Sequence, residues 1–228
     1  MPKVCVIDYG IGNVSSVIAS FDRIGIQCSP LDNPKDLKGA SHVVLPGVGA
    51  FGSAMNRLEE FGWVSAIREH ANNGNAVLGI CLGMQLLAEA SCEGIFPALH
   101  LTKYCQGNST VSGSSSDTDG PVTGLGLISG TVKSLKDIGY GGRLPHIGWN
   151  TVRVTRDGTL FAGLPDELEM YFVHSYGLEV CPLTIATTSC AGEFSAAIQS
   201  GNIFGTQFHP EKSSKYGLGL LRNFVNWS

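Results

Sequence analysis

The spacing of apolar and polar residues changes repeatedly within the first ninety positions of the chain. Short apolar runs, rich in β-branched residues, predict strands buried on both faces at 4–9, 26–28, 42–45 and 76–80. Helical periodicity lies between these runs, in a segment that Asn13 can cap and in residues 51–60 and 63–72. Strands that alternate with helices predict an α/β fold with a mostly parallel central sheet flanked by helices.

The pattern changes after this first part. Residues 107–120 are polar, rich in glycine and serine and without periodicity, so we expect a mobile surface insertion at about 105–122 within a single domain spanning 1–228. Beyond it, the alternation predicts short strands at 126–132, 151–155, 170–174, 184–190, 195–199 and 203–208, and a closing amphipathic helix at 215–227.

Composition narrows the possible functions. The 15 basic and 19 acidic residues give a net charge of -4 without a basic stripe, which argues against a nucleic-acid partner. No apolar run approaches the roughly 20 residues of a membrane helix, and Asp8 comes too early for a secretory signal. The seven cysteines are scattered and form no Cys-x-x-Cys pair, which favours a reducing cytoplasm over a zinc site or a disulfide framework.

The strongest candidate for chemistry is the segment Gly79-Ile80-Cys81-Leu82-Gly83, which joins a predicted strand to a helical pattern. A Gly-x-Cys-x-Gly turn exposes one side chain at a sharp bend, with glycines where a β-carbon would clash. The positive end of the helix dipole favours the thiolate over the thiol. We therefore expect Cys81 to be a nucleophile rather than a core cysteine.

A candidate base follows the last predicted strand, in Gln207-Phe208-His209-Pro210-Glu211. If the strand continues, residues i and i+2 project to the same side, so Glu211 can orient His209. Because reactive groups gather at the carboxyl ends of parallel strands, His209 and Cys81 should meet there. An isolated His-Pro-Glu would be read as a surface loop, but the pair of motifs predicts a Cys-His-Glu nucleophilic enzyme.

The segment 47–52 is a literal Gly-x-Gly-x-x-Gly between a predicted strand and helix. Taken alone it suggests a dinucleotide site, which also requires an acidic residue at the end of the next strand. That strand delivers Cys81 instead. We therefore favour a glycine loop whose amides, from Val48 or Gly49, face an anion formed at the nucleophile.

Together these motifs closely resemble the class I (triad) glutamine amidotransferases. Within that family the chain is similar to the HisH glutaminase subunits of imidazole glycerol phosphate synthase, through its segments 45–49, 124–128, 145–150 and 171–176. The resemblance implies a flavodoxin-like amidotransferase fold and no cofactor or metal. It also implies that L-glutamine is hydrolysed and ammonia passed to a HisF-like (β/α)8-barrel subunit in histidine biosynthesis, as a cytoplasmic heterodimer.

The resemblance also implies roles for individual residues, added to the triad of Cys81, His209 and Glu211. Backbone amides of Leu82 and of Val48 or Gly49 would stabilise the oxyanion. The glutamine pocket would be lined by Gln85, His174, Ser175 and Tyr176. The face toward the synthase would contain Trp149, Asn150, Tyr171 and Lys212.

Two departures from the family pattern leave alternatives open. The region 92–123 is longer than usual, and Ser129 stands where proline is common. A HisH-like paralogue that supplies ammonia for amidation of surface-polysaccharide sugars therefore remains an alternative. A dienelactone-type cysteine hydrolase is less favoured, since its acid usually precedes the histidine. The intact triad argues against a catalytically silent interaction subunit.

Overall fold

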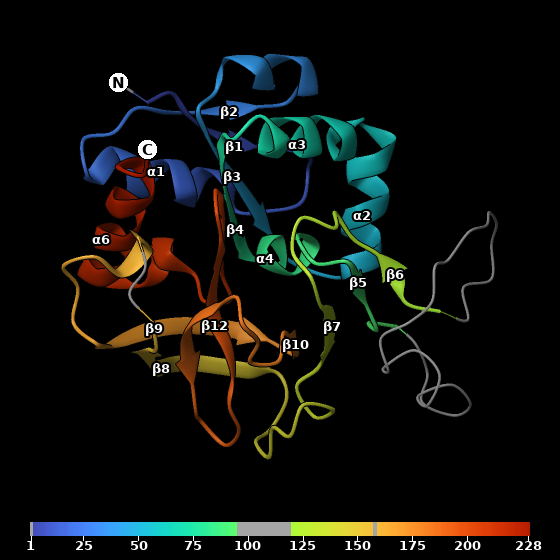
Figure 1. Cartoon of the computed structure of the whole chain (residues 1–228), viewed down its shortest axis with the longest axis vertical. Helices are drawn as coiled ribbons and strands as arrows, with labels where there is room; N and C mark the ends of the chain where they lie inside the picture. The colour runs from blue at the N-terminus through green and yellow to red at the C-terminus, as the bar shows by residue number, and fades with distance from the viewer. Residues whose placement is uncertain (1, 95–119, 157–158) are drawn as a thin grey trace.

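The structure is a computed structural model that describes residues 2–94, 120–156 and 159–228. A nine-stranded sheet runs through it in the order β2-β1-β3-β4-β13-β12-β11-β8-β9 (Figure 1). Its strands are β1 Val4–Ile7, β2 Cys28–Leu31, β3 His42–Gly47, β4 Ala76–Cys81, β8 His146–Val154, β9 Glu167–His174, β11 Thr184–Thr188, β12 Phe194–Ser200 and β13 Ile203–Thr206. The predicted insertion at 105–122 lies outside the described residues except for its end, 120–122.

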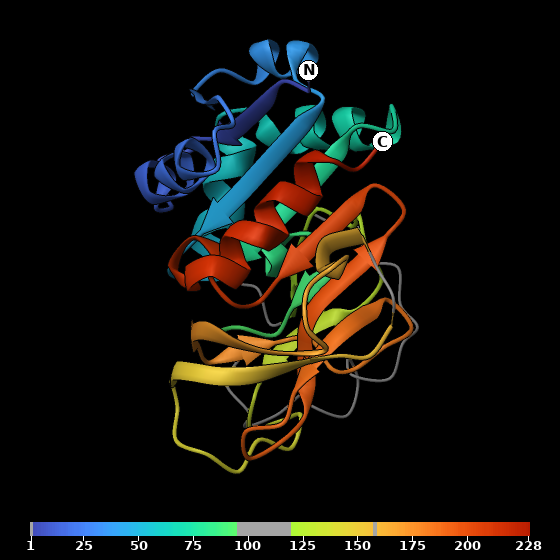
Figure 2. The same cartoon turned by 90° about the vertical axis from the view of Figure 1, so that its left-hand side faces the viewer.

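The sheet is mixed, and the α/β fold class is confirmed. The five strands from β2 to β13 pair in parallel, as the alternation with helices predicts. The pairs from β13 to β9 are antiparallel, because short turns rather than helices connect most of them. In Figure 2 the parallel half occupies the upper part of the molecule, and strand β3 points down toward the antiparallel half.

Helices cover both faces of the parallel half. Helices α1 (Val14–Arg23) and α6 (Ser214–Val225) pack on one face, and α2 (Phe51–Glu60) and α3 (Trp63–Asn72) on the other (Figure 1). The apolar run of strand β1 is continuous because both of its faces are buried. Val4 and Val6 belong to one hydrophobic cluster, whereas Cys5 and Ile7 belong to the other. No helix in the described ranges combines the length and apolar character needed to cross a membrane.

Two strand predictions are wrong. The strand expected at 126–132 is mostly a loop, because Gly126 and Gly130 adopt positive φ angles of 62° and 123°. Only its end belongs to β7 (Thr131–Ser134), in a small second sheet ordered β10-β7-β5-β6. The other three strands are β5 Ala90–Ser91, β6 Val122–Thr123 and β10 Tyr176–Gly177. The strand expected at 26–28 begins only at Cys28.

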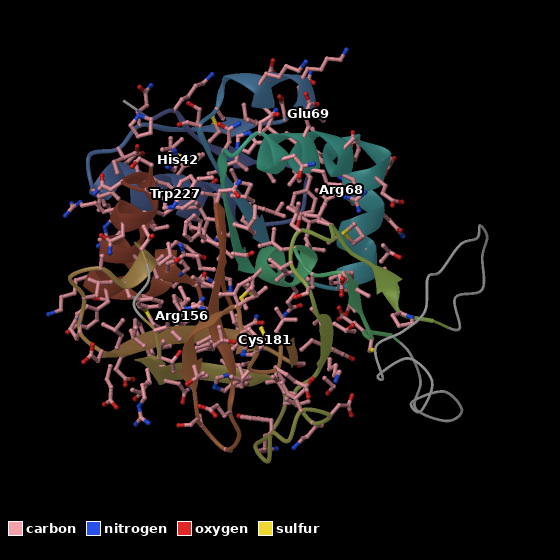
Figure 3. The ribbon with its side chains drawn as sticks, in the orientation of Figure 1. His42, Arg68, Glu69, Arg156, Cys181 and Trp227 are labelled. Atoms are coloured by element: carbon pink, nitrogen blue, oxygen red, sulfur yellow. The ribbon has the colours of Figure 1, made fainter. Side chains whose placement is uncertain are left out.

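Two side chains, one from a helix and one from a strand, connect distant parts of the chain. Arg68 on α3 donates from Nε to the Leu125 carbonyl at 2.8 Å and so holds the loop after β6. At the far end of the sheet, His42 Nε2 lies 3.2 Å from the Trp227 carbonyl, which ties the C-terminal segment to the start of β3 (Figure 3). Both contacts lie away from the carboxyl ends of β3 and β4.

Candidate active site

Cys81 occupies a strained turn between β4 and the five-residue helix α4 (Leu82–Leu86), with φ 55° and ψ -112°. Both flanking glycines are sterically required. A β-carbon on Gly79 would lie 2.6 Å from the backbone of Gly83, and one on Gly83 would lie 1.8 Å from the Leu45 carbonyl oxygen. Strain of this kind persists only where the surroundings enforce it, and it is typical of functional sites.

The register of the parallel strands brings the glycine loop to the same point. Gly47 at the end of β3 pairs with Cys81 at the end of β4, so Val48 and Gly49 follow directly beside the nucleophile. Gly47 is confined by Leu82 and Gly83, and Gly49 has a φ of 92°. A β-carbon on Gly52 would meet nothing closer than 3.8 Å, so this helix does not need its glycine for close approach. The arrangement favours the anion-facing loop over a dinucleotide fingerprint.

Strand β13 brings the histidine and the carboxylate from the other side of β4. Thr206 pairs with Ile80, and the chain continues past Cys81 to His209. His209 Nδ1 lies 2.7 Å from Glu211 Oε1, and the two side chains are 2% and 1% exposed. The expected extended geometry is wrong, because His209 precedes a 3-10 turn, η3 (Pro210–Lys212), that folds Glu211 back onto the ring.

The electrostatics of this pair favour a protonated imidazole. Burial lowers the pKa of His209, but its contacts with Cys81 and Glu211 outweigh burial and raise the pKa to about 9. Oε1 of Glu211 accepts from Nδ1, whereas Nε2 has no hydrogen-bond partner and is free to exchange a proton with a reacting group.

A cavity of about 370 Å³ opens beside Cys81. It brings together nine of the residues predicted for the site: Val48, Gly49, Cys81, Leu82, Gln85, His174, Ser175, Tyr176 and His209. Glu211 lies behind His209 instead. Across the described residues, no group of histidine, cysteine, aspartate and glutamate side chains is placed to hold a metal ion.

Glu93 also lines the cavity, and sequence reasoning missed it. Its Oε2 accepts a hydrogen bond of 2.6 Å from the backbone N–H of Phe51, which fixes the carboxylate at the start of α2. The sequence carries no local signal for this role, because Glu93 follows a two-residue strand and belongs to no recognisable motif.

Hydrogen bonds hold the polar wall of the cavity. Gln85 Nε2 donates to the Tyr176 carbonyl at 2.8 Å and to Gln207 Oε1 at 3.1 Å. Gln207 Nε2 in turn lies 3.9 Å from Cys81 Sγ. With both of its amide hydrogens engaged, Gln85 can offer only its carbonyl oxygen to a ligand.

Three of the four residues predicted for a partner surface lie together next to the site. The Trp149 ring packs edge-on against Tyr171 at 6.0 Å, and Lys212 Nζ lies 5.7 Å from the Tyr171 ring centroid. Trp149 is 51% exposed, which is unusual for so large an apolar side chain. The fourth residue, Asn150, points inward and contacts His146.

Comparison with known proteins shows to which family this site belongs. A family model described as class-I glutamine amidotransferase matches residues 5–227. The chain belongs to this amidotransferase family. Among its relatives are proteins named imidazole glycerol phosphate synthase subunit HisH. The one from Moorella thermoacetica is 43% identical over 98% of this chain and 94% of its own length. The one from Symbiobacterium thermophilum is 40% identical over 98% and 93%.

Solved structures support the amidotransferase fold independently. A glutamine amidotransferase crystal structure matches 97% of both chains with a TM-score of 0.68 at 17% identity. PurLQS from Thermotoga maritima matches 99% of this chain and 98% of its own with the same TM-score at 16% identity. At such identities the likeness concerns the fold alone.

Proposed function

We propose that this amidotransferase is the glutaminase subunit of an imidazole glycerol phosphate synthase, with Cys81, His209 and Glu211 as its catalytic triad. The observation that carries the proposal is the strained cysteine turn, which shares one cavity with His209, the buried partner of Glu211. Relatives named HisH over nearly the whole chain support the choice of substrate and pathway.

The first half of the reaction acylates Cys81. The Sγ thiolate attacks the side-chain amide carbon of glutamine and forms a C–S bond. His209, protonated at neutral pH because its pKa is about 9, donates its Nε2 proton to the amide nitrogen. The C–N bond then breaks and ammonia leaves. The product is a thioester on Cys81, with His209 neutral.

In the second half, neutral His209 accepts a proton from water through Nε2. The hydroxide so formed adds to the thioester carbon, and the C–S bond breaks to release glutamate and the thiolate. In both halves a tetrahedral oxyanion forms, and we assign its stabilisation to the N–H of Leu82 and to that of Val48 or Gly49. Each such donor contributes about 3–4 kcal/mol to transition-state stabilisation.

Substrate recognition follows from the charges in the cavity. Glutamine carries an α-ammonium group, and the Glu93 carboxylate is the anionic side chain on the cavity wall. We assign Glu93 to this ammonium, with the carbonyl oxygen of Gln85 as a second acceptor. His174, Ser175 and Tyr176 form the remaining polar wall.

We assign the neighbouring surface to the (β/α)8-barrel synthase subunit. Trp149, Tyr171 and Lys212 lie next to the site, and the Tyr171 and His209 ring centroids are 6.5 Å apart. Ile147, which is 57% exposed, extends the apolar part of this surface. A cytoplasmic location is part of the proposal, supported by the free thiols of Cys5, Cys28, Cys181 and Cys190.

The isolated subunit should be a poor glutaminase that its synthase partner stimulates. Glycines on both sides of Val48 allow its peptide to alternate between orientations that present or withdraw an oxyanion donor. If the withdrawn state is favoured by about 3–4 kcal/mol, activity lies roughly a hundred- to a thousandfold below that of the active form. Glutamine turnover should be measured for the subunit alone, with the synthase, and with the synthase plus an acceptor analogue. Equal rates in all three would contradict the switch and favour a free-standing hydrolase.

Glu211→Gln should slow hydrolysis less than His209→Asn, about 10²-fold against about 10⁴-fold, because the proton carrier remains.

The contact between His209 and Glu211 should also make stability depend on pH. The folded-state pKa of His209 is raised above the ordinary value of 6.5, so protonation of His209 stabilises the fold fully below pH 6.5, and this stabilisation is lost as pH rises through about 9. The melting temperature of Glu211→Gln should therefore fall furthest below that of the wild type at pH 6 and approach it above pH 9. A difference independent of pH would show that the ion pair does not set the His209 pKa.

A further inference from the structure

A buried row of hydrogen bonds runs from the cavity wall to strand β8. The Tyr176 carbonyl accepts from Gln85 Nε2 and lies 2.8 Å from His174 Nδ1. His174 Nε2 lies 3.0 Å from His146 Nδ1, and His146 Nε2 lies 2.7 Å from Asn150 Nδ2. The antiparallel register of β8 and β9 places His146 directly opposite His174.

The direction of every hydrogen bond in this row is determined. A backbone carbonyl can only accept, so His174 Nδ1 must carry the proton. Burial, with charges nearby, lowers the pKa of His174 to about 3, so the ring is neutral and its Nε2 accepts. His146 must then donate from Nδ1 and accept at Nε2, because burial lowers its pKa too. That acceptor matches the amide donor of Asn150.

The two rings are held rigidly in place. His146 and His174 are 3% and 7% exposed. Both pack against Phe172 and Phe194, with ring centroids 5.0–5.7 Å apart. Such close packing leaves little room for either imidazole to turn over, so a changed proton position cannot be relieved by a ring flip.

We propose that Asn150 and His146 are positioning residues for glutamine hydrolysis, because the Asn150 amide donor stabilises the hydrogen-bond direction that the Tyr176 carbonyl requires at the other end of the row. This inference rests on the proposed function. The Tyr176 carbonyl holds Gln85, and Gln85 lines the glutamine cavity. If the direction were reversed, His174 Nδ1 would become an acceptor facing the Tyr176 carbonyl oxygen. The hydrogen bond between them would be lost, and the carbonyl that holds Gln85 would no longer be fixed in place.

The proton positions can be measured without any assay of activity. Nitrogen-15 NMR of histidine rings in the full chain distinguishes the Nδ1–H from the Nε2–H tautomer. We expect both His146 and His174 as neutral Nδ1–H tautomers, although free neutral histidine favours Nε2–H in water. Finding either ring protonated on Nε2 would overturn the proposal. This result does not depend on whether glutamine is the substrate.

Two substitutions at Asn150 separate hydrogen-bond direction from packing. Asn150→Asp presents an acceptor to His146 Nε2, so it should move the His146 proton to Nε2 and raise the KM for glutamine at least tenfold, with a smaller change in kcat. Asn150→Ala removes the donor without reversing the row, so the tautomers should persist and KM should rise about threefold or less. Asn73→Asp, which adds the same charge after α3, at the opposite end of β4, should change neither.

Equal KM effects of the aspartate and alanine variants, or unchanged tautomers in Asn150→Asp, would overturn the positioning role. Kinetics should be measured on the full chain alone and with the synthase subunit. If the wild type hydrolyses no glutamine under either condition, the proposed function fails instead. The NMR result still decides whether the row has the stated direction.

Discussion

Replacing Cys81 with alanine should lower glutamine hydrolysis by at least about four orders of magnitude while the chain remains folded. The substitution removes the only thiol in the described cavity and therefore the covalent step. Loss of one sulfur atom that already borders a cavity should change the free energy of unfolding by no more than about 1 kcal/mol. Turnover of glutamine and a denaturant titration measure the two effects separately.

Ammonium salts provide the complementary test of the same variant. In complex with the synthase subunit, Cys81→Ala should still support synthesis when ammonium is supplied, because the partner needs only free ammonia. Cys190→Ala is the matched control, since Cys190 is an exposed thiol away from the cavity, and it should retain full activity. Glutaminase activity retained in Cys81→Ala would end the triad hypothesis.

The sequence predicted the parts of the site that depend on parallel strands. Buried apolar runs separated by helices indicate a parallel sheet, and the carboxyl ends of neighbouring strands meet at one edge. Gly47, Cys81 and His209 therefore come together in the structure, as their positions at the ends of predicted strands indicate. The sequence also predicted the close packing around Gly79 and Gly83, because glycines on both sides of one residue are typical of a sharp turn.

Other features depend on contacts that no local pattern encodes. Glu93 reaches the cavity because it binds the backbone of Phe51, which is 42 positions earlier. His146 meets His174 through the register of two antiparallel strands. The turn that brings Glu211 onto His209 is a 3-10 turn, which the spacing of the two residues could not distinguish from an extended strand. Asn150 carries no sign in the sequence that its side chain turns inward.

The glycines of the cysteine turn allow a stability test of the site with an internal control. Gly83→Ala should destabilise the fold by about 3 kcal/mol or more, toward the upper end of overpacking effects. The new β-carbon would lie 1.8 Å from the Leu45 carbonyl oxygen. Neither atom can move by side-chain rotation, so only a shift of the backbone can relieve the clash. The start of α4 would have to move away from β3, which also displaces the N–H of Leu82.

Gly52→Ala is the matched control, because it adds the same methyl group within α2. The nearest atom to that methyl group is 3.8 Å away, and alanine is the better helix former, so stability should rise by up to about 1 kcal/mol. The two variants should thus shift the midpoint of urea unfolding in opposite directions. Because Gly52 is also the third glycine of the Gly-x-Gly-x-x-Gly match, glutaminase activity retained in Gly52→Ala would further separate this loop from a dinucleotide site. A Gly83→Ala protein as stable as Gly52→Ala would show that the turn at Cys81 is far less constrained than its geometry indicates.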